Sequence, residues 1–217
     1  DKVNFIDKKG SFLSDEWFSS AWEFSNGVAM VENKDKRYNF INKEGNLISK
    51  DWFSDAWYFT NGLSRVKNED KKWNFINKEG NLISKDWFFY AENFHDDFAI
   101  VRNEAGEHNF INKEGNLISK EWFSGAENFY DGFARVLNEA EKCNFINKEG
   151  NLISKDWFSK AYRSYDGFAR VRNEAGEYNF INKEGNLISK EWFSDADDFY
   201  DGFARVKNEA GEYNFIN

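Results

Sequence analysis

The feature that most constrains the fold is a short stretch repeated without change. Residues 39–50 read NFINKEGNLISK, and the same letters return at 74–85, 109–120, 144–155 and 179–190. A looser copy, NFIDKKGSFLSD, occupies residues 4–15. The matching phenylalanines stand 35 residues apart with no insertion or deletion, at Phe5, Phe40, Phe75, Phe110, Phe145, Phe180 and Phe215. A constant period predicts that every unit has the same shape and meets its neighbours in the same way.

Residues 144–179 illustrate one unit. NFIN reads as a strand, KEG as a turn through Gly150, and NLIS as the returning strand. The connection KDWFSKA follows, with room for a short fourth strand. YDG at 165–167 is a second turn signal, and FARVRN at 168–173 is the next strand. No window has helical spacing, so the unit is predicted to be an antiparallel β-meander.

Two-residue turns at Ala175-Gly176 and Glu184-Gly185 would determine the register of the strands. They would place Val171 opposite Phe180, Arg170 opposite Ile181, and Ile181 opposite Ile188. One sheet face would then carry Ala169, Val171, Phe180 and Leu187, and the other Phe168, Ile181 and Ile188. Both faces would be apolar and need cover. We expect the next copy to supply it, with residues such as Trp157 and Phe158 filling the gap.

Two architectures satisfy this pattern. Six blades could close into a propeller, or the units could stack as an open β-solenoid. Seven NFI strands with six partners, and a period that is short for a four-stranded blade, count against closure; burial on both faces favours it. We expect an all-β protein, with a propeller-like ring narrowly favoured over the solenoid. Residues 1–217 are expected to form a single repeat domain, with units at 5–39, 40–74, 75–109, 110–144, 145–179 and 180–214 and a partial unit at the C-terminus.

Composition excludes several kinds of partner. The chain has 24 Phe, 9 Trp and 9 Tyr, whose rings can supply the buried area that Leu and Val usually supply. Its net charge of −9, with Lys and Arg spread along the chain, argues against nucleic acid as a partner. No apolar run is long enough to span a bilayer. We expect a monomer.

The chemistry of a catalytic or metal site is not evident. His95, His108 and Cys143 fall in different units without metal-ligand spacing, so no metal or other cofactor is expected. DDFYDG at 197–202 lacks the pattern of a calcium loop. No nucleophile–base pair stands out, and no enzymatic activity is expected. The sequence is compatible with an extracellular, cell-surface or cytoplasmic location.

The unit resembles the bacterial WG-repeat family. That family's pattern runs from an aromatic-Gly pair through Tyr-Ile-Asp, Lys-x-Gly and an apolar strand to Asp-x-Ala and Phe-x-x-Gly-Leu-Ala-x-Val; residues 178–206 here contain YNFIN, KEGNLIS and WFSDADDFYDGFARV. Asn replaces the glycine of the aromatic-Gly pair in every copy, and the usual prolines are missing. The aromatic of the pair survives as Tyr38, Trp73, Tyr178 and Tyr213, while His108 and Cys143 replace it elsewhere. The resemblance implies a bacterial or phage-type repeat scaffold without catalytic residues.

Comparing the copies separates constant from variable positions. The Trp-Phe pairs, the Ala four residues after each Trp, and the Val and Asn of the V-x-N strand are constant, and they are interpreted as packing and turn residues. The positions flanking that Ala, and the position before each NFI, change type. Repeat binders vary specificity in this way, although exposed positions also drift without function. The candidate binding residues are Trp22, Trp57, Tyr58, Tyr90, Glu92, Glu127, Tyr162, Arg163, Asp197, Tyr38, Trp73, His108 and Tyr178.

Trp, Tyr, Arg and acidic side chains at these positions suit an interface. The first hypothesis is a non-catalytic scaffold that binds a protein through the variable positions. The alternative is a lectin-like module, in which exposed rings stack on sugars. A glycan-acting enzyme, which would need a carboxylate pair across a groove, is the least favoured. Repeat five also carries Ser164 where the other units have Phe, a candidate irregularity.

Overall fold

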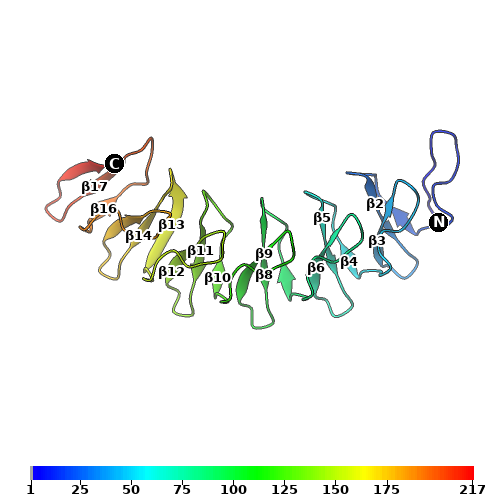
Figure 1. The fold of residues 1–217 in the computed structure, drawn as a ribbon, viewed down its shortest axis with the longest axis horizontal. Helices are drawn as coiled ribbons and strands as arrows, with labels where there is room; N and C mark the ends of the chain where they lie inside the picture. The colour runs from blue at the N-terminus through cyan, green and yellow to red at the C-terminus, as the bar shows by residue number, and fades with distance from the viewer. Residues whose placement is uncertain (1) are drawn as a thin grey trace. The chain divides into compact units, whose positions relative to one another are not determined.

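The computed structural model describes residues 2–217, which contain strands, turns and bends and no helix. Eighteen strands form six antiparallel sheets of three strands each, following one another in chain order (Figure 1). We number the sheets, and the repeats they belong to, one to six. Each sheet except sheet five begins with a two-residue strand, and in every sheet the second and third strands form a hairpin. The expected all-β repeat architecture is therefore confirmed.

The strands of sheets one to three are β1 (Ser20–Ala21), β2 (Val28–Glu32), β3 (Tyr38–Asn42), β4 (Asp55–Ala56), β5 (Leu63–Lys67), β6 (Trp73–Asn77), β7 (Tyr90–Ala91), β8 (Phe98–Arg102) and β9 (His108–Asn112). Those of sheets four to six are β10 (Gly125–Ala126), β11 (Ala134–Leu137), β12 (Cys143–Ile146), β13 (Lys160–Tyr165), β14 (Phe168–Arg172), β15 (Tyr178–Ile181), β16 (Asp195–Ala196), β17 (Ala204–Lys207) and β18 (Tyr213–Ile216).

The chain divides into two compact units. The first comprises Asp1–Asp97, Val101–Glu104 and Lys113–Asn116, and the second comprises Phe98–Ile100, Ala105–Asn112 and Leu117–Asn217. The expectations of a single domain and of a ring rather than a solenoid stay predictions.

The predicted register is wrong by one residue at both turns. Arg170 pairs with Phe180 and Arg172 with Tyr178. The turn after β14 contains three residues, because Asn173 N–H donates to Glu177 O and the Asn173 side-chain oxygen accepts the Glu177 N–H at 2.9 Å. A three-residue loop ending in a left-handed glycine replaces the assumed two-residue turn. The slip moves Phe180 to the opposite face from Ala169 and Val171.

The NLIS segment was predicted as a returning strand, and this is also wrong. It touches the preceding strand through one isolated bridge, Ile181 with Leu187 in repeat five, after a second three-residue turn closed by Asn182. The strand that begins each sheet comes instead from the end of the connection, as in β16 (Asp195–Ala196), which pairs with β17. Asp201-Gly202 forms the predicted tight turn, with both residues at positive φ.

The two faces of each sheet have different characters. The arginine face of sheet five carries Phe168, Arg170, Arg172, Tyr178 and Phe180, and the isoleucine face carries Ala169, Val171, Asn179 and Ile181. We use the same two names for the corresponding positions of the other sheets.

Neighbouring sheets within a compact unit pack an arginine face on an isoleucine face. Phe133, Cys143 and Phe145 of sheet four form one buried cluster with Ala169 and Ile181 of sheet five. Sheets one and two, and sheets five and six, pack in the same order. The prediction that each copy covers its neighbour is confirmed, with the membership of the faces corrected as above. Each fully buried Phe or Ile side chain contributes about 1.5–3 kcal/mol to this packing.

The KEG glycine lies at a second contact between repeats. Gly150 has a φ of 82°, a left-handed conformation that favours glycine. A Cβ atom built on Gly150 would overlap the backbone carbonyl of Ile118, which belongs to the preceding copy of NLIS. The same overlap arises at Gly185 with Ile153. Both the turn and the close approach of two backbones therefore require glycine here.

The Asn that replaces the family's glycine is a buried link within the unit. Asn109 has no exposed surface, and its side-chain amide donates to the carbonyls of Ser119 and Glu121, each at 3.0 Å. Its side-chain oxygen accepts the N–H of Phe110 at 2.7 Å. The same donation ties Asn39, Asn74 and Asn179 to their connections. The NFI strand therefore anchors the long segment that follows it.

Candidate functional site

The variable positions gather around one strand position of the arginine face. In repeat two, Arg65 of β5 lies between two candidate residues, with its guanidinium carbon 4.7 Å from the ring centre of Trp57 and 4.5 Å from that of Trp73. One Arg65 nitrogen donates to the backbone carbonyl of Ala91 in the next repeat. Burial lowers the pKa of Arg65 from its ordinary value. We call such a set an arginine triplet: the residue after the constant Ala, the central strand residue, and the residue before NFI.

The triplet of repeat five has the same form with tyrosines. The guanidinium carbon of Arg170 lies 4.3 Å from the ring centre of Tyr162 and 5.5 Å from that of Tyr178. Arg170 also donates to the carbonyl of Ala196 in repeat six. Its Nε atom is 3.2 Å from a carboxylate oxygen of Asp198, an ion pair that lacks the alignment of a hydrogen bond. The central cation is thus held by both rings and by the next repeat.

Acidic residues take the place of the first ring in two other repeats. In repeat four, Glu127 forms an ion pair with Arg135 and raises the pKa of that guanidinium. Arg135 donates to the carbonyl of Ala161 at 3.1 Å. In repeat six, Asp197 lies 2.8 Å from Arg205 Nε. The residue after the constant Ala therefore carries either an aromatic ring or a carboxylate in all four repeats that have the arginine. Both types of side chain complement a guanidinium.

Repeats one and three lack the central arginine. Met30 stands there in repeat one, and the rings of Trp22 and Tyr38 lie 5.9 Å apart. Ile100 stands there in repeat three, where Glu92 and His108 occupy the flanking positions of the pattern. The sequence prediction therefore selected the outer members of the triplets and missed their centres. The signal for these centres is the Arg before the constant Val, which recurs at Arg65, Arg135, Arg170 and Arg205 and is not among the candidate binding residues.

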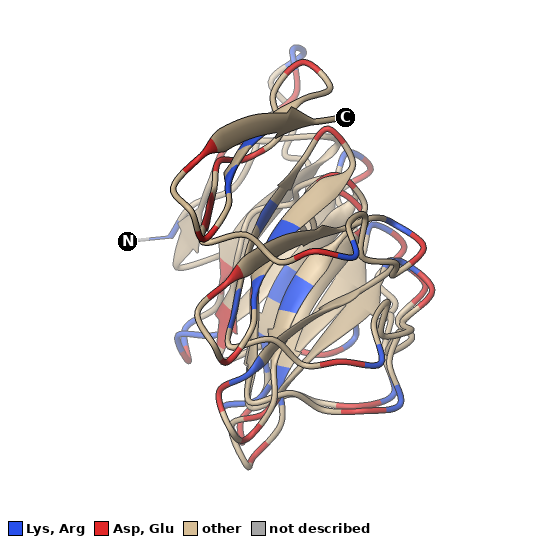
Figure 2. Cartoon of the chain, turned by 90° about the vertical axis from the view of Figure 1, so that its left-hand side faces the viewer, with Lys and Arg blue, Asp and Glu red and all other residues tan. Residues whose placement is uncertain are grey.

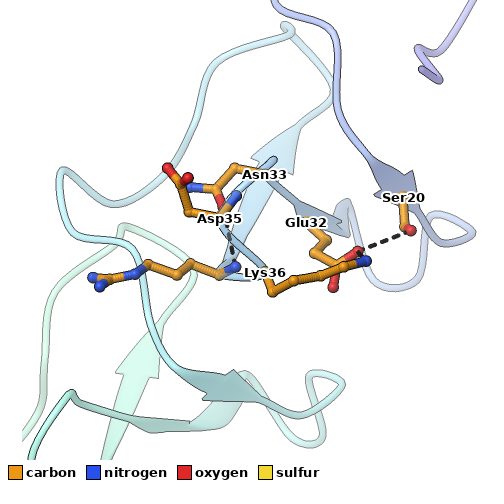
Figure 3. A network of polar contacts seen from close by, with 6 residues as sticks. Ser20, Glu32, Asn33, Asp35 and Lys36 are labelled. Atoms are coloured by element: carbon orange, nitrogen blue, oxygen red, sulfur yellow. Dashed lines mark hydrogen bonds and ion pairs between the residues drawn. The ribbon is translucent and has the colours of Figure 1, made fainter. Parts of the chain in front are cut away.

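A second row of variable residues runs across each sheet one step further along the strands. Figure 3 shows this row in repeat one, where the Ser20 hydroxyl donates to the buried Glu32 carboxylate at 3.0 Å and Lys36 approaches it at 3.1 Å. Burial, and secondarily the Glu32 carboxylate, raises the pKa of Tyr38 above its ordinary value. In repeat three, Arg102 covers the candidate residue Tyr90, with 4.4 Å between the guanidinium carbon and the ring centre.

Exposure differs among the candidate residues. Trp57 and Tyr58 are 46% and 54% exposed, and Arg163 and Asp197 are also exposed. Trp73, at 8%, is buried, whereas the other candidates are half-buried. Arg163 is not part of a triplet, because it lies over the ring of Tyr130 in repeat four, 4.3 Å from its centre. The solvent-facing half of the predicted site is thus formed by the residues that follow the constant Ala.

Repeat five contains the irregularity that Ser164 predicted. Strand β13 is longer than its counterparts and shifts register between Ala161 and Ser164. The Ser164 hydroxyl donates to the carbonyl of Tyr130 at 2.9 Å. In other repeats a Phe at this position pairs edge-to-face with the preceding repeat, for example Phe199 with Phe180 at 4.9 Å. The junction of repeats four and five therefore differs from the other junctions.

Charges are distributed unequally over the fold. Figure 2 shows Lys and Arg on the central strands, while the turns and connections carry both Lys and Arg and Asp and Glu. Within residues 2–217, no group of three or more His, Cys, Asp or Glu side chains could hold a metal ion. In the same residues, no helix is long and apolar enough to cross a membrane.

Comparisons with known proteins give a family and several solved structures of low similarity. Solved structures similar to this chain include BamB from Moraxella catarrhalis (10% identity, 99% of this chain and 78% of that chain covered, TM-score 0.35) and the WD40 beta propeller domain of Doa1 (12% identity, 100% and 88% covered, TM-score 0.32). A designed protein, Ika8, is similar at 10% identity over 95% of this chain and 74% of that chain, with a TM-score of 0.35.

No curated protein matches the sequence. The family described as "WG containing repeat" matches residues 5–36, 40–73, 110–140 and 180–211, which together make up more than half of the chain. The chain therefore belongs to the WG containing repeat family.

Proposed function

We propose that this chain is a non-catalytic scaffold that binds a protein partner through the outer members of its arginine triplets. A tandem β-repeat of this family provides the framework. The observation that carries the proposal is the convergence of variable rings and carboxylates on a recurring arginine, while the surrounding letters stay constant.

The chemistry of the triplets suits a protein surface. Trp, Tyr and Arg are the residues that dominate binding energy at protein interfaces. The arginines of repeats two, four and five are already oriented by a carbonyl of the next repeat, so little side-chain entropy is lost when a partner contacts the side chains beside them. The triplets of repeats two, four, five and six differ from one another, and a partner with a varied surface would match such a series better than a ligand with a repeated unit would.

A second candidate ligand is a carbohydrate. The adjacent exposed rings of Trp57 and Tyr58, with Asp55 two residues before Trp57, could stack on and hydrogen-bond a sugar. This arrangement is confined to repeat two, because the matching pairs in the other repeats hold acidic, amide or arginine side chains.

The test is a selection of random peptides displayed on phage against the folded chain, alongside a glycan array. Peptides that bind should lose at least about tenfold in affinity with Trp57→Ala or Tyr162→Ala, as expected for an interface anchor. Tyr200→Ala is the matched control, because Tyr200 is 85% exposed and lies outside every triplet. Peptides that bind both triplet variants like the wild type would contradict the proposal. Oligosaccharide binding lost with Trp57→Ala, without any selected peptide, would favour the carbohydrate reading.

A further inference from the structure

The junction of repeats four and five contains a cavity on the triplet side. Its volume is about 500 Å³, and it is lined by Arg135, Leu137 and Cys143 of sheet four and by Lys160, Ala161 and Tyr162 of β13, among others. Three of these residues, Cys143, Lys160 and Tyr162, occupy variable positions of the repeat. The thiol of Cys143 is buried and unpaired to any other cysteine.

In four other repeats the chain's own aromatic ring occupies the position of Cys143, as Tyr38, Trp73, Tyr178 and Tyr213. Two cations flank the ring in three of these repeats. Trp73 has the Arg65 guanidinium carbon at 4.5 Å and Lys67 Nζ at 4.8 Å from its ring centre. Tyr178 has Arg170 and Arg172 at 5.5 and 5.4 Å. Tyr213 has Arg205 and Lys207 at 5.1 and 5.3 Å. The position is thus built to hold a ring against a guanidinium.

Repeat four keeps one cation of this arrangement and lacks the ring. Arg135 remains, with Cys143 in place of the aromatic residue and Leu137 in place of the second cation. Leu137 pairs directly with Cys143 across the hairpin. The guanidinium of Arg135 forms an ion pair with Glu127 and donates to the carbonyl of Ala161. Because such contacts lie in the guanidinium plane, its two faces are left for stacking. One apolar wall and one oriented guanidinium suit an aromatic ring from outside the chain.

We propose that this cavity receives a Trp or Tyr side chain of a protein partner, which takes the place that Trp73 and Tyr178 fill in their own repeats. The inference rests on the proposed function and names the class of side chain that the scaffold would recognise at one junction. Tyr162, which follows the constant Ala161, connects the cavity to the neighbouring triplet of repeat five.

The first test uses the wild-type chain and two probes, N-acetyl-tryptophanamide and N-acetyl-leucinamide. The rate at which a small methanethiosulfonate reagent modifies Cys143 is measured at increasing probe concentration. The tryptophan probe should slow the reaction to saturation, because it fills the space beside the thiol, and the leucine probe should have a much weaker effect. Equal protection by both probes, or none by the tryptophan probe, would overturn the inference.

The second test uses binding of the tryptophan probe by NMR to variants of Cys143. Cys143→Tyr places a ring in repeat four where repeat five has Tyr178, and it should weaken probe binding at least about tenfold. Cys143→Ser leaves the cavity open and should bind the probe within about twofold of the wild type. Undiminished binding to Cys143→Tyr would overturn the inference. Should Cys143→Tyr fail to fold, Arg135→Gln, which removes the stacking cation, should weaken the probe severalfold, and unchanged binding would contradict the inference.

The outcome for the cavity is separable from that for the scaffold. Peptides that require Trp57 and Tyr162 but bind Cys143→Tyr like the wild type would refute the cavity alone. Peptides whose affinity is unchanged by the triplet variants would refute the proposed function, irrespective of the probe-binding results.

Discussion

Replacing the KEG glycine with alanine tests how neighbouring repeats meet. Gly150→Ala places a methyl group where the Ile118 carbonyl already lies, and it forces alanine into a φ of 82°. The left-handed conformation alone costs about 1–2 kcal/mol. Overpacking adds about 1–3 kcal/mol, and a backbone carbonyl cannot rotate away as a side chain can. We therefore expect a total loss of about 2–5 kcal/mol in the free energy of unfolding, measured by urea denaturation followed by tryptophan fluorescence.

Two matched glycines isolate the contact between repeats. Gly167 has the same left-handed backbone conformation, with a φ of 84°, and a Cβ atom there would meet only the flexible Lys183 side chain at 3.5 Å. Gly10 occupies the corresponding turn of the first copy with a φ of 85° and nothing within 4 Å. Gly167→Ala and Gly10→Ala should each cost only the backbone term of about 1–2 kcal/mol. Equal losses in all three variants would refute the argument that backbone contact between repeats demands this glycine.

Three further predictions concern the link, the triplet and the hydroxyl of Tyr38. Asn109→Ala leaves the carbonyls of Ser119 and Glu121 without the buried amide and should lower the free energy of unfolding by about 2–4 kcal/mol; Asn4→Ala, which breaks the same bonds at a more exposed site, should cost about half as much in the same urea titration, and equal costs would count against burial as the cause. Arg170→Met, which copies the letter of Met30, should cost about 1–3 kcal/mol because the carbonyl of Ala196 loses its donor, and a thermal melt with unchanged midpoint would argue against this bridge. Because the pKa of Tyr38 is raised in the folded chain, the neutral hydroxyl stabilises the fold up to about pH 10 and this contribution is lost as the pH rises further; Tyr38→Phe should therefore flatten the alkaline loss of stability, and an unchanged pH profile would contradict the assignment.

The period and the turn chemistry could be predicted from the sequence because local rules govern them. Asp201-Gly202 and the KEG glycines occupy turns at positive φ, where glycine and aspartate are favoured. The register could not be predicted, because the Asn173 and Asn182 side chains close three-residue turns in which two residues had been assumed. A single extra loop residue moves every following side chain to the other face.

The site was predicted in part for a related reason. Variation between copies pointed to Trp57, Tyr162 and Glu127, which the structure places beside arginines. The central strand position, which holds arginine in four of the six repeats, was not among the variable positions selected, so Arg65 and Arg170 were overlooked. The cavity lies beside Cys143, whose side chain is smaller than the Trp73 and Tyr178 rings at the equivalent positions of repeats two and five. Recognising it requires a comparison of these three positions in the structure.

The central claim is that binding depends on the variable letters while the framework maintains the fold. The most direct test is the double variant Trp57→Asp and Tyr162→Asp. It gives repeats two and five the residue that repeat six carries at this position, Asp197. Exchanging a cation–π contact for an ion pair should change the free energy of unfolding by no more than about 1–2 kcal/mol. The affinity of peptides selected on the wild type should fall at least about tenfold in the same preparation. Peptides that bind the stably folded double variant with wild-type affinity would contradict the account.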